Sequence, residues 1–299
     1  MPLTSALLVP EQLAIAIPQG RAHGLSFVQH WVAHDWDADT GVWLTFLHVA
    51  YYNIGSALQV FALHKDPTQP GSDLLKLPCA TERRAHRLPT KLARHLQELA
   101  NISLYHGGLH AWMHRHIVWG DPVASWHAMS RELQTVYGNG RWAAYKTCEM
   151  LWKVNGFNLA APDMGHANST GPRHGMALLY QNLPQDNSQS TIRLLDGLSL
   201  DVINNLEQRN VKATIETAET SLCDFHALVD GRYYVGHDID GMQQQLITTP
   251  SNLTARAFAA RRKTIPNEYL GELGGWVGVQ ADRKRIYRDT GQIITRRQQ

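Results

Sequence analysis

Cysteine is scarce in this chain and is not arranged for a structural use. The three cysteines, Cys79, Cys148 and Cys223, lie far apart, and no Cys-x-x-Cys pair occurs among the 299 residues. Neither a disulfide framework nor a zinc finger is supported by so few and so scattered cysteines. A reducing, cytoplasmic location is therefore expected.

Long apolar runs are also missing. The most apolar stretch, residues 42–63, contains His48, Asn53 and Gln59, which a membrane span would rarely tolerate together. The first twenty residues are fairly apolar, but prolines and a glutamate interrupt them and no positive charge precedes them, unlike a secretory signal. We expect a soluble protein with no membrane partner.

The chain has little net charge, only +2. Its distribution is uneven, because residues 255–299 contain ten Lys or Arg against four acids, a local +6. This basic C-terminal region is equally consistent with a solvated tail and with contacts to a phosphate backbone.

Strand patterns are nearly absent, and Arg232 to Gly236 is the one candidate. Apolar residues instead recur at helical spacing, which predicts a mainly α fold. No linker or internal repeat divides the chain, so a single domain spanning 1–299 is expected, with a hairpin and a catalytic loop at 128–180. The predicted helical stretches are 25–32, 42–63, 88–117, 122–136, 141–154 and 201–208.

A tight turn between two of these helices is the most informative local feature. Gly138 and Gly140 bracket Asn139, and a helix is expected to start at Arg141 and end at Gly156. The first turn of a helix has unpaired N–H groups and the positive end of the helix dipole, which together favour a phosphate. We therefore predict that residues 138–141 bind the DNA backbone.

A polar loop follows this helix. Asp163 stands about two dozen residues beyond the turn, where one carboxylate would face a base drawn out of the duplex. The alternative is that Asp163 caps the next helix, since Asp is a favoured N-cap residue.

The segment Gly138-Asn-Gly-Arg-Trp-Ala-Ala resembles the helix-hairpin-helix of the DNA glycosylase superfamily. The resemblance implies a glycosylase-like helical fold with Asp163 as the catalytic aspartate. Trp142 stands where the bifunctional members have a Schiff-base lysine, so the resemblance implies no lyase reaction.

The continuation Asp163-Met-Gly-His-Ala-Asn-Ser-Thr-Gly-Pro-Arg-His-Gly is unlike the repair enzymes. It resembles a phage and bacterial branch of the fold: the α-glutamyl/putrescinyl thymine pyrophosphorylases, or amino acid:DNA transferases, and the helical domain of 5-hydroxymethyluracil DNA kinases. The segments 219–225 and 268–276 are similar to this branch too. A phage-encoded enzyme would work in the host cytoplasm.

Several polar residues near Asp163 are candidates for the chemistry. His166 and Asn168 would share its pocket and move a proton, or would instead cap a helix or bind loop carbonyls. Residues 171–175 read as a turn in which Arg173 and His174 clamp a leaving phosphate, against the alternative of an ordinary loop. Ser169 and Lys146 are assigned to the same substrate and phosphate site.

Other clusters have simpler explanations. His106, His110 and His114 lie one turn apart on an expected helix, but they span too much length for one metal ion, and no metal site is predicted. Asp35, Asp37 and Asp39 are better explained by helix capping than by a calcium loop.

A group of aromatic residues and a group of basic residues each have two interpretations. Aromatic side chains between 31 and 52 would stack on a base or, more commonly, fill the core. A basic group would contact phosphate or a carboxylate, or face solvent. The possible base-pocket residues are Trp31, Trp36, Trp43, Tyr51, Tyr52 and Asn53. The basic group consists of Arg83, Arg84, Arg87 and Lys91.

Together these features favour an enzyme that modifies thymine bases in double-stranded DNA. The resemblance implies that an upstream DNA kinase phosphorylates 5-hydroxymethyluracil, and that an amino acid or polyamine then displaces phosphate or pyrophosphate. No cofactor is expected. The alternatives are a monofunctional DNA glycosylase that excises a modified or damaged base and, less favoured, a DNA-binding module without catalysis.

Overall fold

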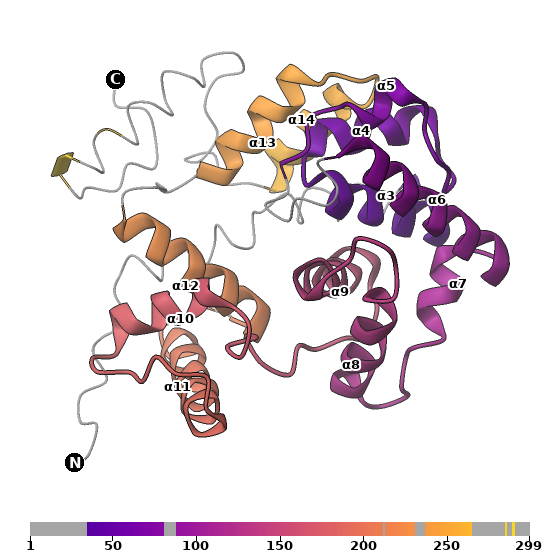
Figure 1. Ribbon diagram of the computed structural model, residues 1–299. Helices are drawn as coiled ribbons and strands as arrows, with labels where there is room; N and C mark the ends of the chain where they lie inside the picture. The colour runs from indigo at the N-terminus through magenta and orange to yellow at the C-terminus, as the bar shows by residue number, and fades with distance from the viewer. Residues whose placement is uncertain are drawn as a thin grey trace. The chain divides into compact units, whose positions relative to one another are not determined.

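The computed structural model describes residues 35–80, 88–211, 213–230, 237–264, 285, 289 and 290. The protein is mainly α-helical, as predicted, and the described part contains no strand (Figure 1). The candidate strand at 232–236, the segment 268–276, Trp31, Arg83, Arg84, Arg87 and most of the basic C-terminal region lie outside the described residues. Among the described helices, none combines the length and the hydropathy that crossing a bilayer requires.

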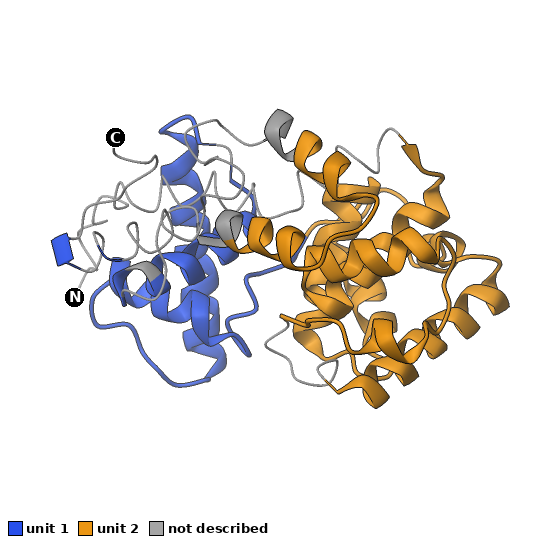
Figure 2. Cartoon of the chain, turned by 90° about the horizontal axis from the view of Figure 1, so that it is seen from above, with its two compact units in different colours: residues 1–23, 161–239, 267–299 blue, residues 24–160, 240–266 orange. Residues whose placement is uncertain are grey.

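Backbone contacts group the chain into two compact units (Figure 2). Unit 2 comprises 24–160 and 240–266, and unit 1 comprises 1–23, 161–239 and 267–299. The single domain expected from the sequence stays a prediction. The predicted hairpin belongs to unit 2, whereas Asp163 belongs to unit 1.

Unit 2 is a bundle of helices with an aromatic-rich core. Trp43, Phe46, Trp112 and Leu151 are buried there. Its helices are α3 (Ala38–Tyr51), α4 (Ile54–Leu63), α5 (Ser72–Leu75), α6 (Pro89–His106), α7 (Leu109–His114), α8 (Pro122–Leu133), α9 (Arg141–Asn155), most of α13 (His237–Thr248) and α14 (Thr254–Thr264). Within this unit, α3 packs against α4, α7 and α9.

The expected helix at 42–63 is in fact two helices. Tyr52 adopts a left-handed backbone conformation, φ 46°, and Asn53 caps α4 by accepting a hydrogen bond from the Ser56 N–H. Asp37 caps α3 by accepting from the Thr40 N–H at 2.9 Å, which confirms the capping interpretation of this acidic segment. Of the possible base-pocket residues, Trp43 and Tyr51 are core side chains with no exposed surface.

The expected helix at 88–117 is also broken. Gly107 and Gly108 have positive φ values of 73° and 126°, so α6 ends at His106 and α7 starts at Leu109. The prediction that His106, His110 and His114 share one helix face is therefore wrong. The break persists because the carboxylate of Asp39 fills the space beside Gly108 and accepts a hydrogen bond from the His110 N–H at 2.7 Å.

Unit 1 has three helices that pack on one another: α10 (Thr170–Leu179), α11 (Gln189–Glu207) and α12 (Ile215–Val229) (Figure 1). Their apolar faces, with Met164 from the preceding loop, form its core. Periodicity predicted only the end of α11, at 201–208, and missed α12. The core residues include Met176, Leu179, Leu195, Val202, Leu206, Leu222 and Phe225.

Candidate active site

The predicted hairpin consists of α8, the connecting residues 134–140 and α9. Gly138 has φ 86°, a conformation that favours glycine. Gly140 has an ordinary φ of −103° and is the N-cap of α9, without a side-chain cap. Because Gly140 is exposed and a Cβ there would meet nothing within 4 Å, the first turn of α9 is open to a ligand.

The hairpin turn is tied to α6 and α8. Asn139 donates its Nδ2–H to the Leu133 carbonyl at 3.0 Å, so its amide closes the end of α8. Next to it, the Tyr137 carbonyl lies 2.7 Å from Nδ1 of His95, and the Tyr137 N–H donates to Glu98 at 3.2 Å. The Asn139 N–H also donates to the Val136 carbonyl at 3.0 Å, so both its side chain and its backbone N–H are engaged within the protein. The predicted phosphate contact is therefore left to Gly140 and the start of α9.

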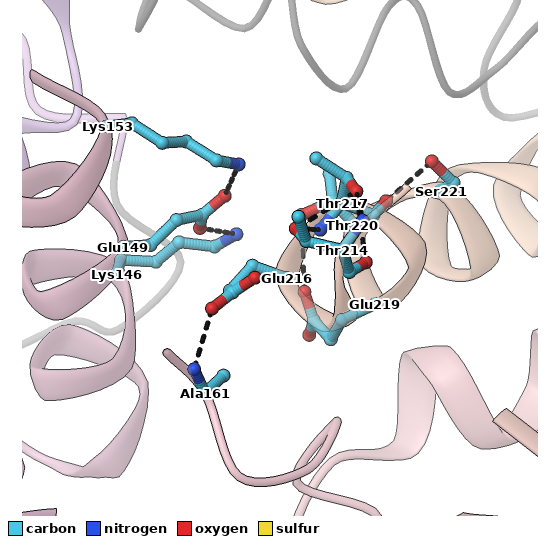
Figure 3. Close-up of polar contacts among 10 residues, drawn as sticks. All are labelled: Lys146, Glu149, Lys153, Ala161, Thr214, Glu216, Thr217, Glu219, Thr220 and Ser221. Atoms are coloured by element: carbon cyan, nitrogen blue, oxygen red, sulfur yellow. Dashed lines mark hydrogen bonds and ion pairs between the residues drawn. The ribbon is translucent and has the colours of Figure 1, made fainter. Parts of the chain in front are cut away.

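Further along α9, a buried carboxylate binds two lysines (Figure 3). Glu149 is 1% exposed, and its two oxygens accept hydrogen bonds from Lys146 at 2.8 Å and Lys153 at 2.7 Å. Burial alone would raise the pKa of Glu149, but the two positive charges outweigh burial and lower it to about 2. Lys146, assigned to phosphate binding from the sequence, is engaged with Glu149, and its role at the phosphate stays a prediction.

We expect Glu149 to make stability fall in acid. Its folded pKa of about 2 lies below the ordinary 4.5, so its contribution is complete above pH 4.5 and is lost as the pH falls toward 2. This lowering of the pKa corresponds to a contribution of ~3 kcal/mol to the free energy of unfolding at neutral pH. Glu149→Gln should therefore lower the free energy of unfolding at neutral pH by an amount that shrinks in this acid window, measured by urea unfolding. Glu207→Gln, on an exposed position of α11, is the control, and equal losses at all pH values would contradict the prediction.

The Asp163 loop in unit 1 is anchored on both sides of the aspartate. The Ala161 N–H donates to the buried carboxylate of Glu216 at 2.7 Å (Figure 3), and Met164 is buried in the core. Asp163 itself is half-buried, and its Oδ1 accepts a hydrogen bond from the Gly165 N–H at 2.6 Å. Since α10 starts only at Thr170, with Ser169 as N-cap, the alternative that Asp163 caps this helix is wrong.

His166 is buried beneath the same loop. It is 1% exposed, and its Nε2 lies 2.8 Å from Oγ of Ser199 on α11. Burial lowers the pKa of His166 to about 4, with Asp163 opposing the decrease and Arg173 adding to it. His166 is therefore a neutral imidazole at pH 7.

Arg173 lies on a helix and not in a turn. Residues 171–175 form the start of α10, where Pro172 is tolerated because the first N–H groups of a helix have no intrahelical partner. The Arg173 guanidinium donates to the Asp186 carbonyl at 2.7 Å, to the Asn187 side chain, and to the His166 carbonyl at 3.5 Å. These bonds use three of its five N–H groups.

The glycines of this segment have a packing role. A Cβ on Gly171 would lie 2.6 Å from Sγ of Cys223, and one on Gly175 would lie 2.3 Å from the Leu222 carbonyl oxygen. Both contacts come from α12, so the two glycines let α10 and α12 approach closely. Neither glycine has a positive φ that would mark a turn.

Asp196 is a site residue that the sequence interpretation missed. It is half-buried on α11, and its Oδ1 is buried with no hydrogen-bond partner among the described residues. Burial, followed by the negative charge of Asp163, raises the pKa of Asp196. We call Asp163, His166, Arg173 and Asp196 the Asp163 cluster. A polar residue three positions before Ser199, within an otherwise apolar helical pattern, was the signal available in the sequence.

The other predicted site residues of this segment are not buried. His174 is exposed, with its ring centroid 4.7 Å from that of His226. Asn168 is exposed, and the Ser169 N–H donates to the Gly165 carbonyl at 2.8 Å. The structure thus brings together Asp163, His166 and Arg173 of the predicted set and adds Asp196.

The sequence model of the amino acid:DNA transferase family matches residues 26–234. The chain belongs to this family. The match includes both the hairpin and the Asp163 cluster, and it confirms the family that the sequence motifs resemble. No curated protein matches the chain.

Membership of the amino acid:DNA transferase family identifies a transferase that takes part in DNA modification. In the parts of this transferase that the structure describes, no group of three or more His, Cys, Asp or Glu side chains is placed to hold a metal ion. The Asp163 cluster brings two carboxylates, an imidazole and a guanidinium into one unit of the chain.

Proposed function

We propose that this enzyme displaces phosphate or pyrophosphate from phosphorylated 5-hydroxymethyluracil in DNA with the amine of a glycine-like amino acid or a polyamine. The proposal is supported by the family match and by the half-buried Asp163 carboxylate beside a buried imidazole, an aspartate and an arginine. An upstream DNA kinase would supply the phosphorylated base.

The hairpin provides the sequence-independent contact with DNA. The open first turn of α9 presents backbone N–H groups and the positive end of a 15-residue helix to a phosphate. The modified base then leaves the stack, because its exocyclic methylene is not freely approachable within the duplex.

Asp163 prepares the nucleophile. At neutral pH an alkyl amine is mostly an ammonium ion and has no free electron pair. Asp163 accepts one ammonium proton, and the neutral amine attacks the methylene carbon. A C–N bond forms, the C–O bond breaks, and the phosphate leaves with the electron pair. The second proton lost from nitrogen passes to solvent.

Arg173 stabilises the departing phosphate with the N–H groups that its bonds to the 186–187 loop leave over. His174, one residue further along α10, is exposed and adds a ring N–H donor. Positive charge that is already positioned where negative charge develops lowers the barrier without further reorganisation.

Mass spectrometry of nucleosides tests the proposal. DNA containing 5-hydroxymethyluracil is treated with a hypermodification-type DNA kinase, then with this protein and pooled amino acids and polyamines. A mass gain that requires both the kinase and the protein is expected, and the added mass identifies the nucleophile. Free base with abasic DNA would instead identify a glycosylase, and unchanged nucleosides would contradict both.

A further inference from the structure

Two hydrogen bonds determine which nitrogen of His166 carries its proton. Oγ of Ser199 lies 2.8 Å from the Leu195 carbonyl oxygen and 2.8 Å from Nε2 of His166. A carbonyl only accepts, so the Ser199 hydroxyl donates to Leu195, and its oxygen accepts from an Nε2–H of the ring. Nδ1 of His166 therefore carries a lone pair, and it is buried with no hydrogen-bond partner among the described residues.

The Asp196 carboxylate lies on the same side of α11. Asp196 and Ser199 are three residues apart on the helix and share a face. The bond between Ser199 and His166 brings the Asp163 loop to that face. Oδ1 of Asp196 is a second buried acceptor without a partner in the described part of the chain, and the effect of Asp163 on the pKa values of both groups places its charge nearby.

These groups accept hydrogen bonds but do not supply them to one another. The carboxylates of Asp163 and Asp196 are acceptors when ionised, and Nδ1 of His166 is an acceptor in this tautomer. Arg173, the nearby cation, directs Nη1 and Nη2 to residues 186 and 187. An alkylammonium group has three N–H donors, no acceptor and a positive charge, which complements this set.

We infer that Asp196, with Asp163 and Nδ1 of His166, forms the subsite that receives the ammonium group of the incoming amine. The inference rests on the proposed function and adds to it a second carboxylate and a positioned imidazole. Ser199 is a positioning residue, because it holds the ring in the tautomer that leaves Nδ1 free to accept. The ligand chemistry is a primary ammonium, which amino acids and polyamines share.

Calorimetry on the full chain bound to DNA with unphosphorylated 5-hydroxymethyluracil measures amine binding without turnover. The probes are glycine, putrescine and glycolate, which keeps the carboxylate of glycine but has a hydroxyl in place of the ammonium. Glycine or putrescine should bind and thereby identify the amine source, whereas glycolate should not. Glycolate binding as tightly as glycine, or no binding of either amine, would overturn the inference.

Asp196→Asn should raise the Kd of the bound amine about tenfold or more, because the charged partner of the ammonium is lost. Asp201→Asn, the same change at an exposed position of the same helix, should leave the Kd unchanged. Equal affinities of wild type and Asp196→Asn would overturn the inference. Thermal unfolding midpoints establish that each variant is folded.

Ser199→Ala provides a second, independent variant if Asp196→Asn does not fold. It removes the acceptor for Nε2–H, so the proton can move to Nδ1 and the amine Kd should rise several-fold. An unchanged Kd in this variant also counts against the subsite. Loss of amine binding together with retained transfer would overturn this inference alone, whereas retained binding without any transfer on kinase-treated DNA would overturn the proposed function alone.

Discussion

Asp163→Asn is expected to lower the rate of amine transfer to kinase-treated DNA by about 10²–10⁴-fold, the range that general acid–base groups contribute. The asparagine oxygen can still accept the hydrogen bond from the Gly165 N–H, so the loop should keep its shape. What the variant loses is the negative charge and the ability to take a proton from the ammonium. Transfer is measured by mass spectrometry of nucleosides, with DNA affinity measured by fluorescence anisotropy.

The pH dependence separates proton transfer from a structural effect. As the pH rises toward the pKa of the free amine, near 10.4 for a lysine-like amine, solution supplies more neutral nucleophile. The difference in rate between wild type and Asp163→Asn should therefore shrink with rising pH. A purely structural defect would give the same ratio at every pH.

Full transfer activity in Asp163→Asn at unchanged DNA affinity would remove the role assigned to this residue. Arg173 and Asp196 would then have to account for the chemistry. The assignment to the amino acid:DNA transferase family would stand, since it rests on the match over residues 26–234.

Gly175→Ala is expected to destabilise the protein by about 3 kcal/mol, within the upper range for forcing extra atoms into a packed core. The new Cβ would lie 2.3 Å from the Leu222 carbonyl oxygen, and backbone cannot move aside as the end of a flexible side chain can. Helices α10 and α12 must separate, which disturbs the core around Met176 and Leu222. Thermal and urea unfolding measure the loss.

Gly197→Ala is the matched control, because it is also a glycine in a helix of unit 1. A Cβ at Gly197 meets nothing within 4 Å, so this change should stabilise the helix by up to ~1 kcal/mol through helix propensity. Equal effects of the two substitutions would show that Gly175 has no special packing role. Because Arg173 lies on α10, Gly175→Ala should also weaken transfer in the fraction that stays folded.

The limits of α9 could be predicted from the sequence because they depend on local signals. Gly138 at the turn, Arg141 at the helix start and Gly156 at its end all lie as predicted, and Gly156 adopts the left-handed conformation, φ 75°. A left-handed residue costs little only for glycine, so its position in the sequence carries the information. Helix capping by the acidic segment 35–39 was predicted for the same kind of reason, and the structure assigns it to Asp37.

Local signals were misleading where a distant partner decides the outcome. Gly-Pro-Arg-His-Gly has the composition of a turn, yet it is part of α10. Its two glycines, Gly171 and Gly175, lack the Cβ atoms that would collide with α12, so the segment packs closely against that helix. Likewise, the histidines at 106, 110 and 114 are spaced for one helix, but the carboxylate of Asp39, from another helix, stabilises the break at Gly108. In both cases the deciding contact joins residues far apart in the chain.

The sequence by itself determined the helical class, the position of the hairpin turn and the family, because periodicity, glycine positions and motif spacing are local properties. The role of Asp163 as the central carboxylate stays a prediction. Only the tertiary structure decided that Ser199 contacts His166, that Lys146 binds Glu149, and that Arg173 is held by residues 186 and 187. The physical reason is that burial and hydrogen-bond partners, which set the charge and tautomer of each group, depend on segments that meet only when the chain folds.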